Sequence, residues 1–295
     1  MSLGSSLTSI GTSAFYGCSA LAGIVLPNTV SSLPSNAFRD CTSLTSVTLP
    51  DGLTTMGTEV FRGCSSLTHV VLPSTLTSVD ASAFYGCTGL VSVVFPSSLT
   101  SVGNKAFFYC SSLQSAVLPN SVTSLGTAAF QLCSSLTSVV LPDSLTQLPD
   151  WIFSGCSSLS SIAIPNTLAV IGQQAFAYCS ALRHVDFPAS VVRIKEKAFL
   201  DCTAMDSVVV PSGVTFLGNG VFRGCTSLVS ATLPNTLTSI SEELFYNCRS
   251  LASFVFPDSL TSIGFQAFYC CRNLSDVVVP DRVQAIGMSA FYRLK

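Results

Sequence analysis

The stretch LTSVTLPDGLTTMGTEVFRGCSS, from Leu44 to Ser66, recurs about a dozen times along the chain without an insertion or deletion. A cysteine, a phenylalanine and a proline mark the repeat, and each returns every 23 residues. The cysteines are Cys18, Cys41, Cys64, Cys87, Cys110, Cys133, Cys156, Cys179, Cys202, Cys225, Cys248 and Cys271. This period predicts that each copy is one coil of a solenoid, because a coil can bury its apolar side only by stacking on its neighbours.

The residue pattern inside one coil predicts its local structure. Val47 and Leu49 are two residues apart, so they share one face of a strand. Pro50 has no N–H to donate and ends the ladder there. Residues 54–55 form a second short extended piece between two apolar residues. The apolar residues within 60–67 have helix-like spacing, which predicts one helical or 3₁₀ turn.

Together these signals predict the fold and its divisions. We expect one right-handed leucine-rich-repeat solenoid over 1–295, in the α/β class but β-rich, with one long parallel sheet and a short second extended edge. It comprises a partial coil over 1–20, eleven full coils over 21–273 and a nearly complete last coil over 274–295. Glycines such as Gly57 precede the turn, but Pro34 stands in the same column. Because proline cannot adopt a positive φ, we expect the glycines to be there for their small size and not for a left-handed backbone.

Composition excludes some classes of function. Charged residues make up 9% of the chain and the net charge is −2, whereas soluble proteins carry roughly 25% charged residues. The sequence has no basic stripe, which argues against nucleic-acid binding. No apolar run reaches the ~18 residues that a membrane span needs. The first residues lack the features of a signal peptide. Both ends fall inside a repeat, so we expect either a fragment of a longer protein or ends that something else covers.

The repeated phrase carries a family resemblance. LxxVxLP resembles the strand signature of leucine-rich repeats, and LTSIGxxAFxxCSSLTSVxLPxxL is similar to their BspA-like class. The common pattern places Asn or Cys three residues after the strand; this chain has Gly52, Thr75, Ser98, Ser121 or Ser144 there. The resemblance implies a microbial or protist surface or secreted protein that binds host proteins, matrix proteins or other cells.

The cysteines and histidines form no recognisable catalytic or metal-binding motif. Twelve cysteines share one core column, which predicts a ladder of buried thiols; some disulfides and a metal site are the alternatives. Cys270 lies outside that column, and we expect it to be the exposed thiol. His69 and His184 occupy an outward column five coils apart and cannot share a metal. We therefore predict no enzymatic activity and no cofactor.

Three surface columns have regular composition. One column holds outward valines, among them Val140 and Val209. They are there either because valine has a high propensity for parallel sheets or because they form an exposed apolar stripe that binds a partner. A serine column runs beside them. A threonine column on the other side of the coil is a remote candidate for ice binding, which a measurement of thermal hysteresis tests.

Charge is concentrated between residues 183 and 206. The patch includes Arg183, His184, Asp186, Arg193 and Lys195, and it provides either solubility or a binding site. We expect Arg183 to pair with Asp206 in the next coil.

These features favour a non-enzymatic protein-binding or adhesion module that uses the outward sheet face and this patch. The family resemblance implies that its partner is a host, matrix or cell-surface protein. The alternative is a structural spacer or scaffold that associates end to end, which concentration-dependent assembly would support.

Overall fold

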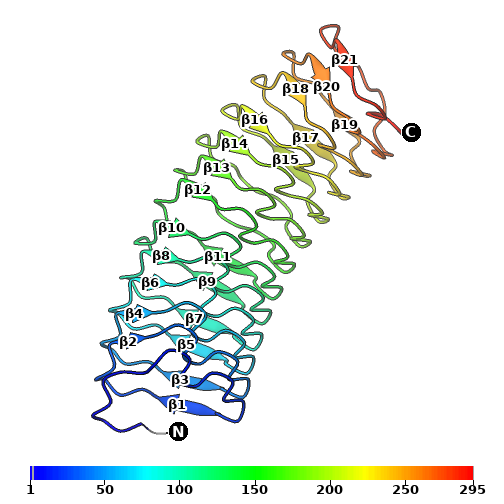
Figure 1. Ribbon diagram of the computed structural model, residues 1–295. Helices are drawn as coiled ribbons and strands as arrows, with labels where there is room; N and C mark the ends of the chain where they lie inside the picture. The colour runs from blue at the N-terminus through cyan, green and yellow to red at the C-terminus, as the bar shows by residue number, and fades with distance from the viewer. Residues whose placement is uncertain (2, 295) are drawn as a thin grey trace. The chain divides into compact units, whose positions relative to one another are not determined.

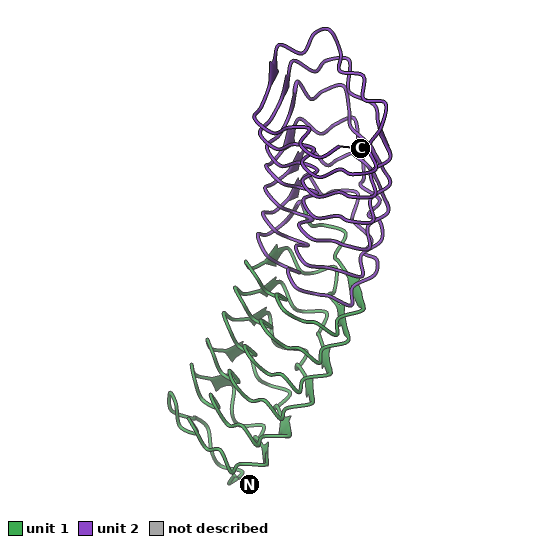
Figure 2. Cartoon of the chain, turned by 90° about the vertical axis from the view of Figure 1, so that its right-hand side faces the viewer, with its two compact units in different colours: residues 1–145 green, residues 146–295 purple. Residues whose placement is uncertain are grey.

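The computed structural model describes residues 1 and 3–294, and it is a stack of parallel β coils (Figure 1). The chain divides into two compact units, Met1–Leu145 and Thr146–Lys295 (Figure 2). Both are built from the same 23-residue coil, so the predicted leucine-rich-repeat solenoid is confirmed. The expectation that 1–295 acts as a single domain stays a prediction.

Each coil of unit 1 contributes a three-residue strand from LxxVxL and a two-residue strand after the proline. The longer strands are β1 (Gly23–Val25), β3 (Ser46–Thr48), β5 (His69–Val71), β7 (Ser92–Val94), β9 (Ser115–Val117) and β11 (Ser138–Val140). The shorter ones are β2 (Ser32–Leu33), β4 (Thr55–Met56), β6 (Ser78–Val79), β8 (Ser101–Val102) and β10 (Ser124–Leu125). Figure 1 shows the two sets as two separate columns of arrows.

Unit 2 repeats this arrangement with fewer strands in the first column. That column holds β15 (Ser207–Val209), β17 (Ser230–Thr232) and β19 (Ser253–Phe254). The second column, called the second edge below, holds β12 (Gln147–Leu148), β13 (Val170–Ile171), β14 (Arg193–Ile194), β16 (Phe216–Leu217), β18 (Ser239–Ile240), β20 (Ser262–Ile263) and β21 (Ala285–Ile286). All pairings are parallel, with partners 23 residues apart.

The expected long sheet is interrupted in the first column. The first column forms the pairs β1–β3, β5–β7 and β9–β11, then the sheet β15–β17–β19. Stacked phenylalanines line the core, with ring centroids 5.0–5.4 Å apart from Phe15 to Phe130 and 5.3–5.8 Å from Phe153 to Phe291. Paired strands prefer a spacing of about 4.8 Å. The widest ring spacings, 5.8 and 5.7 Å around Phe222, lie beside the unbroken sheet β15–β17–β19, so the phenylalanine stack does not by itself decide where pairing is interrupted.

The turn around each phenylalanine is not helical, which corrects the expected helical or 3₁₀ turn. No helix occurs in the part of the chain that the structure describes. The residues two before and two after Phe61, Glu59 and Gly63, have φ of 56° and 73°, and the same two positions are left-handed in the other coils. A right-handed helix cannot continue through such residues. Their N–H groups instead donate to the next coil, as Glu59 does to the Ala81 carbonyl at 3.0 Å.

The glycine column before the turn keeps neighbouring coils close, as predicted. A Cβ on Gly57, Gly103 or Gly126 would lie 2.3–2.7 Å from a backbone nitrogen of the preceding coil. None of these glycines has a positive φ. In unit 2 the ladder opens between β16 and β18, where Ser241 replaces the glycine. The Ser241 hydroxyl there donates to the Leu217 carbonyl in place of a backbone N–H.

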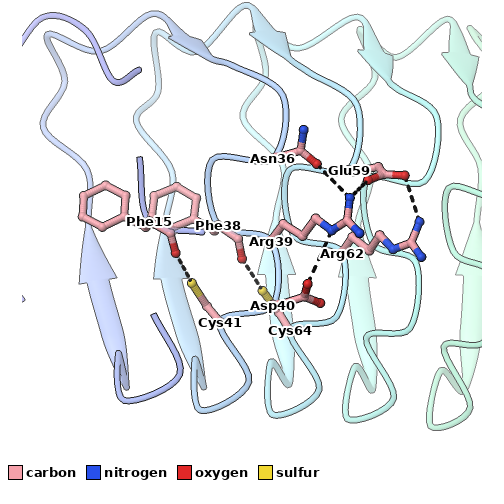
Figure 3. A network of polar contacts seen from close by, with 9 residues as sticks. All are labelled: Phe15, Asn36, Phe38, Arg39, Asp40, Cys41, Glu59, Arg62 and Cys64. Atoms are coloured by element: carbon pink, nitrogen blue, oxygen red, sulfur yellow. Dashed lines mark hydrogen bonds and ion pairs between the residues drawn. The ribbon is translucent and has the colours of Figure 1, made fainter. Parts of the chain in front are cut away.

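The cysteine column has a polar role besides filling the core. The Cys41 thiol donates to the Phe15 carbonyl at 3.0 Å and the Cys64 thiol to the Phe38 carbonyl at 3.1 Å (Figure 3). The same bond to the preceding coil recurs along both units, up to Cys271. The described cysteines are free thiols. Burial raises the pKa of Cys133 to about 12, which keeps the thiol protonated as this bond requires.

A hydroxyl column takes the place of the asparagine in the common leucine-rich pattern. Ser98 donates to the Leu76 carbonyl at 2.7 Å and Ser121 to the Leu99 carbonyl at 2.6 Å. Each bond ties the turn after the proline to the preceding coil. Each thiol gives a phenylalanine carbonyl a second bond, since the carbonyl also accepts the N–H of the cysteine three residues later, as Phe38 does from Cys41 at 3.3 Å. The hydroxyl column supplies bonds to carbonyls at the turn after the proline.

Candidate protein-binding surface

The outward valines of the first column form an exposed apolar row in unit 1. Val71, Val94, Val117 and Val140 are 53–65% exposed, because successive side chains of a strand point to opposite faces. Their neighbours Val70 and Val139 are buried. The expected outward direction of these valines is therefore confirmed, and Val140 belongs to β11 of unit 1.

In unit 2 the same face is hollowed between two coils. Residues 182–187 form no strand, so they are not paired with β15. A groove of about 220 Å³ separates them, and its walls include His184, Asp186, Ser207 and Val209. His184 and Asp186 are exposed, and Val209 is 66% exposed. The structure therefore brings together three of the predicted binding residues. We call this hollow the His184 groove.

Arg193 and Lys195, which the sequence placed in the same patch, lie elsewhere. Arg193 is in β14, on the second edge of the coil (Figure 1). Its guanidinium lies over the Phe216 ring, 4.4 Å from the centroid. The Lys195 ammonium pairs with the Asp150 carboxylate at 3.1 Å. The predicted patch is thus two groups, because residues ten positions apart in a 23-residue coil occupy different sides of it.

The predicted ion pair between Arg183 and Asp206 is wrong. No salt bridge joins them among the residues that the structure describes. They are linked by their backbones instead, since the Asp206 N–H donates to the Arg183 carbonyl at 3.1 Å. The Asp206 carboxylate accepts a bond from the Ser207 hydroxyl at 2.9 Å. Arg183 stays exposed and free to meet a partner.

A second groove on this face was missed by sequence reasoning. It has a volume of about 320 Å³, lies between β17 and residues 253–258, and includes Val255, which is 84% exposed. Phe254 stands where other coils have a smaller apolar residue, and its ring contacts Phe245 and Phe268 edge-on at 5.4 and 5.1 Å. This larger residue at one core position was the available signal.

The exposed thiol is also not the predicted one. Cys270 is 7% exposed, although its φ of 60° places it at a left-handed turn position. Its N–H donates to the Tyr292 carbonyl of the following coil at 2.8 Å, so that coil covers it. Cys18 is exposed instead.

Several surface features carry no catalytic or metal-binding geometry. Within the described residues, no group of three or more His, Cys, Asp and Glu side chains is placed to hold a metal. His69 and His184 are both exposed, as expected.

The threonine column, the remote candidate for ice binding, uses its hydroxyl hydrogens within the chain. Thr54 and Thr100, for example, donate to carbonyls of the preceding coil at 3.1 and 2.9 Å. No helix in the described part has the length and apolar character to cross a bilayer.

Comparison with known proteins identifies the family. The sequence matches the family described as BspA type leucine rich repeat region (6 copies) over residues 1–114, 100–229 and 193–295. The chain belongs to the BspA-type leucine-rich-repeat family. No curated protein matches it.

Solved structures of bacterial leucine-rich-repeat proteins share this fold. One from Bacteroides ovatus is 28% identical, with 97% of this chain and 80% of that chain covered and a TM-score of 0.66. The T. pallidum protein is 36% identical over 55% of this chain and 78% of that chain, with a TM-score of 0.52. A third, from Faecalibacterium prausnitzii, is described as a leucine rich cell surface protein; it is 28% identical, covers 92% and 76%, and has a TM-score of 0.55.

Proposed function

We propose that this BspA-type chain is a non-enzymatic protein-binding module of adhesion type, and that it acts at the cell surface. The observation that carries the proposal is the His184 groove, which joins the exposed apolar side chain of Val209 to the polar side chains of His184 and Asp186. Protein interfaces combine an apolar centre with such polar groups at their rim. The expected partner is a host, matrix or cell-surface protein.

Two further features support a binding role on this face. The valine rows are exposed along both units, and an apolar stripe on a regular sheet is typical of an interaction surface. A neighbouring structure of the same fold is described as a cell surface protein. The surface location and the choice of partner are inferences from these similarities.

The test is quantitative capture of partners by three baits. The first is the chain itself, and the second carries His184→Ser and Asp186→Val, the residues that most other coils have at these positions. The third carries Arg193→Ser, the common residue of its column on the second edge, as a matched control. Because every substitution follows the repeat, all three baits should fold alike, which urea midpoints verify.

The outcomes separate the alternatives. A protein held by the first and third baits and lost by the second supports the His184 groove as the site. A protein lost only by the third bait places the site on the second edge and contradicts the proposal. If no bait retains a protein and the chain associates with itself as its concentration rises, the scaffold alternative is favoured.

A further inference from the structure

A column of stacked aromatic and arginine side chains runs along the turns of unit 2, on a different part of the coil from the His184 groove. It is formed by the residues that follow the last four core phenylalanines, Arg223, Tyr246, Tyr269 and Tyr292, and by Arg293 beside Tyr292. The rings of Tyr246 and Tyr269 are 4.8 Å apart and nearly parallel, and those of Tyr269 and Tyr292 are also 4.8 Å apart. The Arg223 guanidinium covers the Tyr246 ring at 4.3 Å, and that of Arg293 covers Tyr292 at 5.3 Å.

The backbone holds this column in place. The N–H of Asn247 donates to the Tyr269 carbonyl at 2.7 Å, and the N–H of Cys270 donates to the Tyr292 carbonyl at 2.8 Å. Both donors are left-handed residues, with φ of 61° and 60°. The spacing of the tyrosines is therefore fixed before any ligand binds, which lowers the entropic cost of binding.

Unpaired cations lie on the same turns. Arg249 and Arg272 follow Asn247 and Cys270 by two residues, in a column that holds serine or threonine in every earlier coil, and both are exposed. The Arg249 Nε donates to the Asn247 side chain at 2.8 Å, which holds the guanidinium on the turn. Among the described residues, no carboxylate lies within ion-pair distance of Arg249, Arg272 or Arg293.

In the equivalent column of unit 1, the arginines are paired with carboxylates of the chain itself. Arg39 and Arg62 both pair with Glu59, and Arg39 also lies 3.4 Å from the Asp40 carboxylate (Figure 3). The Arg62 guanidinium lies over the Tyr85 ring at 4.5 Å. In unit 1 the carboxylates are thus supplied by the chain, whereas among the described residues of unit 2 only Arg223 pairs with one, that of Glu243. The remaining unit 2 arginines leave positions for anions of a ligand.

The chemistry of this surface selects an anionic ligand with many oxygens. Stacked rings present their edges, which carry the positive part of the ring quadrupole, and their hydroxyls to the solvent. Guanidinium groups bind carboxylate and sulfate-like oxygens through paired N–H donors. An extended peptide presents side chains on one side only every ~6.7 Å, out of step with the tyrosine column. A linear polysaccharide carries oxygens along its whole length, so it can meet hydroxyls that recur every 4.8 Å.

We propose that this tyrosine–arginine ladder, formed by Tyr246, Tyr269, Tyr292, Arg249, Arg272 and Arg293, binds an acidic polysaccharide that carries sulfate or carboxylate groups. The arginines pair with the anionic groups, and the phenol hydroxyls bond to ring and hydroxyl oxygens of the sugar. This is a second binding activity, independent of the protein-binding role proposed above.

The test measures binding of the whole chain to four immobilised polymers. They are heparin, which is sulfated, hyaluronan, which carries carboxylates only, neutral dextran, and polyglutamate. The disrupted variant carries Arg249→Ser and Arg272→Ser, which restore the common residue of that column. The control carries Arg183→Thr and Arg193→Ser, which remove the same charge from other parts of unit 2. A third variant changes the three tyrosines to phenylalanine, the residue at Phe108, and so keeps the stack while removing the hydroxyls.

We expect binding to heparin, to hyaluronan or to both, and none to dextran. Which of the two binds identifies sulfate or carboxylate as the recognised group. The Arg249/Arg272 variant should bind at least about tenfold more weakly, since two charge-assisted contacts are lost. The control should change affinity by less than about twofold, and the phenylalanine variant should be weakened by about threefold or more.

Three results would overturn the proposal. The first is an equal loss of affinity in the disrupted and control variants, which would indicate that net charge alone drives binding. The second is binding of polyglutamate as tight as that of the polysaccharides, and the third is no binding to either heparin or hyaluronan. A variant with His184→Ser and Asp186→Val should bind polysaccharide normally, so failure of either proposal leaves the other intact.

Discussion

At the scale of single residues, the thiol column does more than fill space. A buried cysteine usually acts as a small hydrophobe, yet here buried thiols of the column such as Cys64 and Cys133 also donate to the carbonyl of the phenylalanine in the preceding coil. The serine and threonine column after the proline does the same for a second carbonyl. Side-chain donors thus add bonds between coils to those that the short strands supply.

The thiol bond predicts an order of stabilities for variants of Cys133. Cys133→Ala loses the donor to the Phe107 carbonyl and leaves a small cavity, and we expect a cost of about 1–3 kcal/mol. Cys133→Ser keeps a donor and should cost less. Urea midpoints test this, with Cys18→Ala as the control, since that repeat position is exposed. A serine variant less stable than the alanine variant would mean that the thiol acts only as a hydrophobe.

Thiol reactivity distinguishes the exposed cysteine from the buried ones. At neutral pH a thiol reagent should label about one cysteine in the folded chain, and Cys18→Ser should abolish this labelling. Cys270→Ser should leave it unchanged, because the following coil covers that residue. Denaturant should expose all thirteen thiols. Labelling of the folded chain that persists in the Cys18→Ser variant would contradict this assignment.

At the scale of the coil, one glycine column controls how closely neighbouring coils approach. A Cβ at Gly126 would lie 2.3 Å from the backbone nitrogen of Asn104, and backbone cannot move aside as a flexible side chain can. Where Ser241 fills this column, β16 and β18 are unpaired. Lys195 fills it as well, yet its N–H still donates to the Ile171 carbonyl at 2.9 Å. The coil therefore tolerates a side chain at some sites by adjusting locally.

The glycine column gives a matched pair of substitutions. Gly126→Ala should destabilise the chain by about 1–3 kcal/mol, the usual cost of overpacking. Gly11→Ala occupies the same repeat position but has nothing within 4 Å, so its effect should stay within about 0.5 kcal/mol. Urea denaturation compares the two. Equal effects would show that the loss of backbone freedom, and not the close approach of coils, decides this column.

At the scale of the whole molecule, the many buried thiols make stability depend on alkaline pH. Burial raises the pKa of Cys133, Cys179 and Cys271 to about 12 from an ordinary value near 9. A group whose pKa is raised by folding contributes its full stability below its unfolded pKa and loses it as pH rises towards the folded value. Above pH ~9, each such thiol should lower the free energy of unfolding by about 1.4 kcal/mol per pH unit.

The pH dependence can be measured by urea midpoints between pH 7 and about 10.5. The wild-type midpoint should be steady up to pH ~9 and then fall steeply. A variant with serine at Cys133, Cys179 and Cys271 should show a shallower fall, since serine does not ionise in this range. A wild-type midpoint unchanged at the highest pH would show that these thiols do not titrate on unfolding.

The two proposed binding surfaces differ in how far the sequence could reveal them. The valine column and His184, Asp186 and Val209 follow from strand alternation and from the concentration of charge in a few coils. The tyrosine–arginine ladder was missed, because its members are 23 residues apart and only stacking makes them one surface. Comparing the residues that follow the phenylalanines from one repeat to the next would have revealed the consecutive tyrosines.

The sequence by itself determined the solenoid, its 23-residue coil, the buried phenylalanine and cysteine columns and the outward valines, because a strict 23-residue period repeats the same local pattern in every coil. Only the tertiary structure decided what depends on how neighbouring coils meet: the interrupted sheets, the separation of Arg193 and Lys195 from His184, and the burial of Cys270. These outcomes depend on contacts between residues of neighbouring coils and on the path of the chain around each coil, as when the following coil covers Cys270, and a local sequence pattern does not specify them.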